Sequence, residues 1–361
     1  MRILYAIQGT GNGHLSRARD IIPVLQKNHF VDILISGTQA DIELPYPVKY
    51  RFKGLGFIFG ANGGIDLVET YKKNHIRVLL NEINILPVQD YNLVINDFEP
   101  VSAWACYLKN VKCISISHQA AVLNKKAPQP KDIDLIGKAI LKNYAPSSAK
   151  YGFHFSAYDS NIFTPVIRSQ VREQHIENKG HYTVYLPAYD DNRILKVLKQ
   201  CENVSWQVFS KHNKKLIGRK NITIQPISNE AFIESMATSA GVLCGAGFET
   251  PAEALFMKKK LMVIPMKGQY EQFCNAAALK KMGVPVLKSL KLKNLEKIKN
   301  WVEKDSFVEV DYPDNTESII NSILATHSAD TALEPSVDLE FTVKKFRNLV
   351  MKKIVAQLSL I

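Results

Sequence analysis

The chain of 361 residues carries 46 lysines and arginines against 34 aspartates and glutamates, a formal net charge of +12. Hydrophobic residues make up 46% of it, which suits two ordinary domains with separate cores and excludes a disordered chain. The basic excess predicts an anionic partner, such as a phosphorylated substrate or a membrane surface, although solubility alone explains part of it. Lysine dominates and no arginine–aromatic module occurs, so we expect no nucleic-acid partner.

The cysteines and the apolar runs of the sequence indicate where in the cell the protein is expected to lie. The five cysteines are odd in number and show no Cys-x-x-Cys spacing, which predicts a reduced, cytoplasmic protein. The first residues, MRILYAIQGTGNGH, are typical of a core strand entering a glycine turn rather than of a signal peptide. No apolar run reaches the ~18 residues that a membrane span needs. We therefore expect a cytoplasmic protein that is soluble or peripheral on the inner face of the plasma membrane.

The first element in chain order is a buried strand over 3–7, followed by the turn GTGNGH at 9–14 and a helix with apolar residues at 18, 21, 22 and 25. Such a turn also begins dinucleotide-binding folds, which would make the protein NAD-linked. Its spacing is Gly-x-Gly-x-Gly, and the next strand, 31–35, ends in Ser36 and Gly37 where an acidic residue for the ribose is expected. Both features disfavour NAD.

Polar residues follow two further strands of the first half. A strand at 91–95 leads to Asp97 and Glu99, and either carboxylate is placed to act as a general base at the C-terminal edge of the sheet. Asp97 is favoured because it directly ends the strand, with capping of the next helix as the alternative. A strand at 111–117 ends at His118. The glycine-rich stretch 53–64 predicts a lip over a binding site or a long surface loop.

The segment 131–144 has apolar and lysine residues at helical spacing. It is either an ordinary amphipathic surface helix or a membrane-facing one, and the lysines that would face an anionic bilayer are Lys125, Lys126, Lys131, Lys138 and Lys142. Asp132 and Asp134 form an Asp-x-Asp pair, but they lie at a helix start and not at a strand end, so we interpret them as helix-end charge. No metal-binding motif occurs, and we expect no metal.

The segment 240–283 predicts two successive strand–loop–helix units, whose loops open at the same edge of a parallel sheet. The first loop contains Gly245, Ala246 and Gly247, and with the helix N-terminus after it this loop suits a diphosphate. Thr250 and Glu253 have the spacing of a capping box. Glu253 is alternatively an acceptor for the two hydroxyls of a ribose, and the spacing leaves both readings open.

The same segment resembles the donor motif of GT-B glycosyltransferases, on the residues GFETPAE at 247–253, Pro265 and EQFCNA at 271–276. The nearest resemblance is to family 28, which includes the lipid-linked N-acetylglucosaminyltransferase of peptidoglycan synthesis and monogalactosyldiacylglycerol synthase. It implies that Glu253 holds the ribose and that Glu271 and Gln272 hold sugar hydroxyls. The residues implied around the donor nucleotide sugar are Gly245, Ala246, Gly247, Phe248, Thr250, Glu253, Glu271 and Gln272.

The glycine turn resembles the Gly-x-Gly-Gly-His turn of that family, with Asn12 inserted. The resemblance implies that His14 lies between acceptor and donor as the catalytic base, with Asp97 as the other candidate and helix capping as the alternative role of His14. It also implies that Gly11, Gly13 and His118 lie on the acceptor side.

The fold implied by this resemblance is α/β, with two Rossmann-like, doubly wound parallel-sheet domains facing a cleft. We expect an acceptor domain over 1–160, a linker over 161–180, a nucleotide-sugar domain over 181–335, and a final helix within 336–361 that crosses back to the first domain. The implied reaction is an inverting, metal-independent and cofactor-free transfer of a sugar, most simply from UDP, to a lipid-linked or other hydroxyl acceptor. A nucleotide-sugar epimerase of the same fold and a non-catalytic nucleotide-sugar-binding protein are the alternatives.

Overall fold

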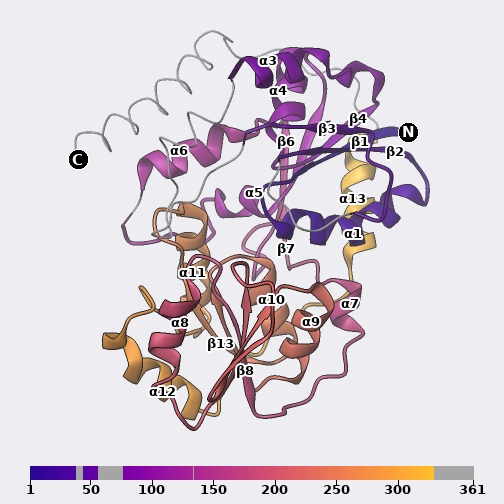
Figure 1. Cartoon of the computed structure of the whole chain (residues 1–361). Coiled ribbons are helices and arrows are strands. Elements are labelled where there is room, and N and C mark those ends of the chain that lie inside the picture. Colours follow the sequence, from indigo (N-terminus) through magenta and orange to yellow (C-terminus); the bar gives the residue numbers. More distant parts are fainter. Residues whose placement is uncertain (38–43, 56–75, 133, 329–361) are drawn as a thin grey trace.

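The computed structural model describes residues 1–37, 44–55, 76–132 and 134–328, and it has two α/β domains, each built on its own sheet. In Figure 1 the first domain, indigo to magenta, lies above the second, which is red to orange. The expected α/β class with two mostly parallel sheets is therefore confirmed. Much of the stretch expected to form a lip, residues 56–64, lies outside the described residues.

The first sheet has the strand order β3-β2-β1-β4-β5-β6-β7, and all its neighbours pair in parallel. Its strands are β1 (Arg2–Gln8), β2 (Phe30–Ser36), β3 (Tyr50–Phe52), β4 (Leu93–Asp97), β5 (Cys113–Ile116), β6 (Ala149–Phe153) and β7 (Ile162–Phe163). The short strands β6 and β7 are not apparent in the sequence, and β7 lies within the range expected to be a linker.

Helices cover both faces of this sheet, which is why β1 is apolar without alternation. Ile3, Tyr5 and Ile7 of β1 pack in one core with apolar residues of α1, while Leu4 and Ala6 pack in a second core with those of α4. The helices of this domain are α1 (Asn12–Gln26), α3 (Ile76–Ile85), η1 (Val88–Asp90), α4 (Pro100–Leu108), α5 (His118–Val122) and α6 (Leu135–Tyr144).

The second sheet has the order β10-β11-β9-β8-β12-β13, parallel except for the pair β10 and β11. Its strands are β8 (His181–Tyr185), β9 (Ser205–Ser210), β10 (Ile217–Arg219), β11 (Ile222–Pro226), β12 (Gly241–Gly245) and β13 (Lys260–Ile264). Its helices are α8 (Asp191–Leu198), α9 (Asn229–Thr238), α10 (Glu249–Phe256), α11 (Tyr270–Lys281), η2 (Leu292–Asn294) and α12 (Leu295–Glu303).

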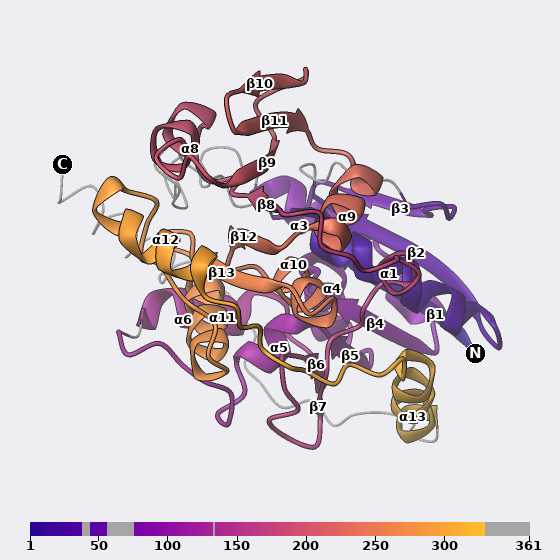
Figure 2. The same ribbon diagram turned by 90° about the horizontal axis from the view of Figure 1, so that it is seen from below.

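Within the described residues, two segments connect the domains. Helix α7 (Ser169–Arg172) lies in the first crossing, between β7 and β8. After α12 the chain runs across to α13 (Thr316–Ser328), as Figure 2 shows, and α13 packs on α1 of the first domain. Lys27 Nζ and Glu317 Oε2 form an ion pair of 2.6 Å between these two helices. The range 336–361, where we expected the returning helix, lies outside the described residues.

No helix within the described residues is long and apolar enough to cross a membrane. The five cysteines are all buried free thiols.

Candidate active site

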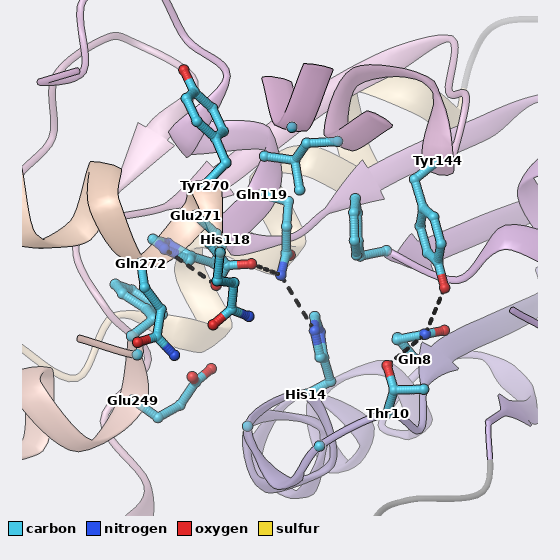
Figure 3. Close-up of a pocket in the computed structure, with 18 of the residues that line it drawn as sticks. Gln8, Thr10, His14, His118, Gln119, Tyr144, Glu249, Tyr270, Glu271 and Gln272 are labelled. Carbon is cyan, nitrogen blue, oxygen red and sulfur yellow. Dashed lines mark hydrogen bonds and ion pairs between the residues drawn. The ribbon is translucent and has the colours of Figure 1, made fainter. Parts of the chain in front are cut away.

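A cavity of about 250 Å³ lies between the two domains, at the carboxyl ends of their parallel strands. The first domain contributes side chains and turns from α1 and α5, namely Gly11, Gly13, His14, Arg17, His118 and Gln119. The second domain contributes Gly247, Phe248, Glu249, Glu271 and Gln272. Figure 3 shows His14 and Gln119 on one side, with Glu249, Glu271 and Gln272 approaching from the other domain.

His14 stands in the first turn of α1, directly after the glycine turn. Gly11 has φ 127°, a left-handed backbone that favours glycine, and it is the N-cap of the helix. At Gly13 a Cβ would lie 2.6 Å from Oε2 of Glu249, so a side chain there would have to displace the carboxylate that approaches from the second domain. The turn therefore aims His14 at the cavity and leaves space for α10. No side-chain cap is present at this helix, so the capping role considered for His14 is not observed.

Asp97 lies behind His14 and not in the cavity wall. Parallel pairing places it beside Ile7 at the end of β1, one strand away from the glycine turn. Its side chain is 0% exposed, and Oδ1 lies 2.8 Å from Nδ1 of His14. A carboxylate only accepts hydrogen bonds, so Nδ1 of His14 carries the hydrogen and Nε2 of the neutral ring keeps its lone pair.

The pKa values of this pair follow from burial and charge. Burial lowers the pKa of His14, but the negative charge and hydrogen bond of Asp97 outweigh it, and the net pKa lies above the ordinary value. For Asp97, burial raises the pKa, while Arg17 and His14 together hold it below its usual range. The two groups thus favour an imidazolium beside a carboxylate, which is the state that forms when His14 takes up a proton.

Arg17 is a site residue that we did not expect from the sequence. Its side chain is 2% exposed, its Nη2 donates to both oxygens of Asp97 at 2.8 Å, and its Nη1 forms an ion pair with Glu249 of the second domain. Its position three residues after His14 places both side chains on one face of α1, and this spacing is the signal that could have found it. Burial lowers its pKa, but the two carboxylates outweigh that effect and raise it, so Arg17 stays charged.

Glu99, the alternative to Asp97 as a base, is a helix cap. Its carboxylate accepts from the backbone N–H groups of Val101 and Ser102 at 2.7 and 2.6 Å and from Oγ of Ser36 at 2.6 Å. It is fully buried and does not line the cavity. The capping role considered for Asp97 thus belongs to Glu99.

His118 contacts the second domain. Its ring stacks on Phe248 at 3.9 Å between centroids and 5° between planes, and its Nε2 lies 2.7 Å from Oδ1 of Asn275. Burial lowers the pKa of His118, and the opposing charge of Glu271 does not restore it. The residue lines the cavity, but its ring is held between the domains by stacking and hydrogen bonds.

The loop 245–248, which we expected to bind the donor, leads into a helix that begins earlier than expected. Helix α10 begins at Glu249 with Phe248 as its N-cap, and no side chain caps it, so the capping box of Thr250 and Glu253 is wrong. Stacking on His118 anchors Phe248 at the start of the helix, and Thr250 already lies inside the first turn. Of the residues expected around the donor, Gly245, Ala246, Thr250 and Glu253 do not line this cavity.

Glu253 is paired with Arg168, a residue between β7 and α7. Nε and Nη2 of Arg168 lie 2.5 and 2.8 Å from the two carboxylate oxygens, and Nη1 donates to Oδ1 of Asn229 at 2.7 Å. Glu253 is only 2% exposed. Its role toward a ribose therefore stays a prediction, because both of its oxygens are engaged here.

Glu271 and Gln272 stand in the first turn of α11 and line the cavity. Oε1 of Gln272 accepts the backbone N–H of Met266 at 2.8 Å, and Oε2 of Glu271 accepts Nε2 of Gln119 at 3.0 Å. Gln119 is the second site residue that we did not expect.

The side of the cavity away from the donor loop is aromatic. The rings of Phe98 and Tyr144 stack at 4.6 Å, and the Tyr144 hydroxyl accepts Nε2 of Gln8 at 2.8 Å. Phe98 has φ 58°, a strained backbone for a residue with a side chain, and such strain clusters at functional sites. These residues form a wall next to His14 that suits the ring or chain of an acceptor.

Among the described residues there is no group of three or more histidine, cysteine, aspartate or glutamate side chains able to hold a metal ion. The charged groups around the cavity are instead paired with one another.

This architecture, with the cavity between two parallel-sheet domains, is that of a GT-B glycosyltransferase. The family model of glycosyl transferase family 1 matches residues 1–304, and the chain belongs to this family. Membership in a glycosyltransferase family favours the transferase over the two alternatives of an epimerase and a binding protein. None of the curated proteins is significantly similar in sequence.

Solved structures share the fold at low sequence identity. MurG from Acinetobacter baumannii is 14% identical with a TM-score of 0.54, over 90% of this chain and 99% of MurG. The spinosyn forosaminyltransferase SpnP is 13% identical with a TM-score of 0.54, over 97% of this chain and 99% of SpnP. UGT89C1 from Arabidopsis thaliana, solved with UDP, is 13% identical with a TM-score of 0.55, over 97% of this chain and 98% of that one. At these identities the likeness shows a shared fold.

Proposed function

We propose that the protein transfers a sugar from UDP to a hydroxyl acceptor, with inversion at the anomeric carbon and without a metal ion. The observation that carries this proposal is the hydrogen bond between His14 and Asp97, which aims a basic Nε2 at a cavity walled on the other side by Glu271 and Gln272. A UDP-sugar is the simplest donor because UGT89C1, of similar fold, was solved in complex with UDP.

In the proposed reaction the acceptor hydroxyl gives its proton to Nε2 of His14 while its oxygen attacks the anomeric carbon. The new carbon–oxygen bond forms as the bond from that carbon to the phosphate oxygen breaks, and UDP leaves with the bonding electrons. A single displacement of this kind inverts the configuration and needs one base but no protein nucleophile. Asp97 stabilises the resulting imidazolium, as the upward pKa shift of His14 indicates.

The diphosphate is proposed to lie on the loop 245–248 and the N-terminus of α10, whose unpaired N–H groups attract anions. Glu249 in the first turn of α10 would repel it if it were unpaired. The ion pair with Arg17 offsets the negative charge of Glu249. Arg17 thereby helps an anionic leaving group to develop in this cavity without a metal ion.

The acceptor is proposed to be a lipid or a lipid-linked glycan of the cell envelope, reached from the cytoplasmic face of the membrane. Helix α6 supports this, because Leu135 at its start is 73% exposed and Lys138 and Lys142 follow on the same helix beside the aromatic wall. The positive charges of these lysines favour binding to an anionic membrane surface.

The test is UDP release from UDP-glucose, UDP-galactose and UDP-N-acetylglucosamine, with and without alcohol acceptors and with EDTA present throughout. We expect acceptor-dependent UDP release that EDTA leaves unchanged, and a product of inverted anomeric configuration by proton NMR. A protein that binds no UDP in calorimetry, or that releases UDP only when Mg²⁺ is added, would overturn the proposal.

A further inference from the structure

Gln119 connects the two halves of the cavity through a single amide group. It lies on α5, is 4% exposed and lines the cavity. Its Nε2 donates to Oε2 of Glu271 at 3.0 Å, and the same nitrogen lies 3.4 Å from Nε2 of His14. Figure 3 shows the amide of Gln119 between these two side chains.

The chemistry of the partners determines the orientation of this amide. Glu271 offers only acceptor oxygens, so the NH₂ group and not the carbonyl of Gln119 must face it. The second hydrogen of the NH₂ group then points to His14, whose Nδ1 hydrogen is used by Asp97 and whose Nε2 lone pair is free. At 3.4 Å this second hydrogen bond is long and weak, so a better donor can replace it.

The carbonyl oxygen of Gln119 has no hydrogen-bond partner within the part of the chain that the structure describes, although it is buried. Buried amide oxygens almost always accept a hydrogen bond, because a buried oxygen without one costs free energy. Gln119 lines the cavity, so a ligand bound there is the nearest source of the missing hydrogen-bond donor.

We propose that Gln119 is a positioning residue that selects acceptors with two hydroxyls on adjacent carbons, an inference that rests on the proposed function. The reacting hydroxyl displaces the Gln119 amide from Nε2 of His14 and donates to that nitrogen. The neighbouring hydroxyl donates to Oε1 of Gln119. The Gln119 amide lies within 3.4 Å of Nε2 of His14, so the ligand groups that meet Nε2 of His14 and Oε1 of Gln119 are neighbours as well, as in a sugar ring or a glycerol unit.

Glu271 gives the same amide a connection to the donor. When Glu271 binds the hydroxyls of the donor sugar, it holds the amide of Gln119 in the orientation that receives the acceptor. Occupation of the donor site and selection of the acceptor are then linked through this hydrogen bond.

The first test compares trans-cyclohexane-1,2-diol with cyclohexanol, which differ by one hydroxyl, as ligands of the full chain saturated with UDP. We expect the diol to bind about tenfold more tightly, the ratio that one well-formed hydrogen bond gives. In Gln119→Met the ratio should fall to within about twofold, while Gln174→Met, outside the cavity, should keep the parental ratio. Equal affinity in the parent, including no binding of either alcohol, overturns the proposal, and so does a ratio that survives in Gln119→Met.

The second test follows the imidazole of His14 by NMR in uniformly labelled protein. The Gln119 amide donates to the neutral ring of His14, so its removal in Gln119→Met should raise the pKa of His14, whereas a purely structural glutamine would leave it unchanged. An unchanged pKa of His14 overturns the proposal. Sugar transfer without any preference for diols would contradict the role of Gln119 and leave the proposed function standing. Diol preference without turnover of any UDP-sugar would support the role of Gln119 and contradict the proposed function.

Discussion

Nδ1 of His14 lies 2.8 Å from Oδ1 of Asp97, and Nη2 of Arg17 donates to both oxygens of the same carboxylate at 2.8 Å. Asp97 is thus fixed in position by a permanent cation, and it fixes the ring orientation of His14 in turn. This arrangement makes His14 the group whose protonation state changes and Asp97 the group that supports it.

Replacement of His14 by alanine is expected to lower the turnover rate by about 10²–10⁴ and to leave UDP affinity unchanged, because a general base acts on the rate. UDP-release assays measure the turnover rate, and calorimetry with UDP measures the affinity. His175→Ala, at an exposed histidine that does not line the cavity, is the matched control and should behave as the parent does. A His14→Ala variant that still transfers sugar within a few-fold of the parental rate would move the base to another residue.

The rate should rise with pH through the pKa of His14, because only the neutral ring accepts a proton. Since Asp97 outweighs the effect of burial, the midpoint is expected above the ordinary value of 6.5. Asp97→Asn should move the midpoint of kcat/KM downward and lower the rate on the alkaline side. The stability that protonated His14 gains from Asp97 is present below its unfolded pKa and is lost as pH rises through the folded pKa. A midpoint that Asp97→Asn does not move would show that another group titrates.

Arg168→Met is expected to destabilise the fold without weakening UDP binding, whereas Glu253→Gln should weaken UDP binding as well. Removing one partner of a buried ion pair typically costs about 3–5 kcal/mol, and both variants break the pair of Arg168 and Glu253. Only Glu253 is predicted to meet the ribose. Calorimetric melting and UDP titration separate the effects, and a Glu253→Gln variant with parental UDP affinity would leave Glu253 as a partner of Arg168 alone.

Anionic vesicles are expected to bind the protein through the first domain in a manner that salt reverses. Each lysine near the surface adds about 1 kcal/mol, so replacement by glutamine of all five should abolish sedimentation with the vesicles. The five are Lys125, Lys126, Lys131, Lys138 and Lys142. The control replaces five lysines of the second domain, namely Lys288, Lys291, Lys293, Lys297 and Lys299. Equal sedimentation of parent and first-domain variant at low salt would favour a soluble acceptor.

The sequence alone determined the elements whose signals are local. The apolar runs of β1 and β12 and the glycine turn before α1 are each specified by a few consecutive residues. Parallel strands place their carboxyl ends at one edge, so Asp97 was expected at that edge of the sheet, and the structure joins it directly to His14. Family resemblance in the donor segment added Glu271 and Gln272, which line the cavity.

Only the tertiary structure decided the partners across the two domains. Arg17 meets Glu249, which is 232 positions further along the chain, and Gln119 meets Glu271 after 152 positions. Glu253 is engaged by Arg168 and not by its own helix end, because α10 begins earlier than its residues suggest. Such pairs form where two separately folded cores dock, and a contact made by docking leaves no periodicity or spacing in the sequence from which it can be predicted.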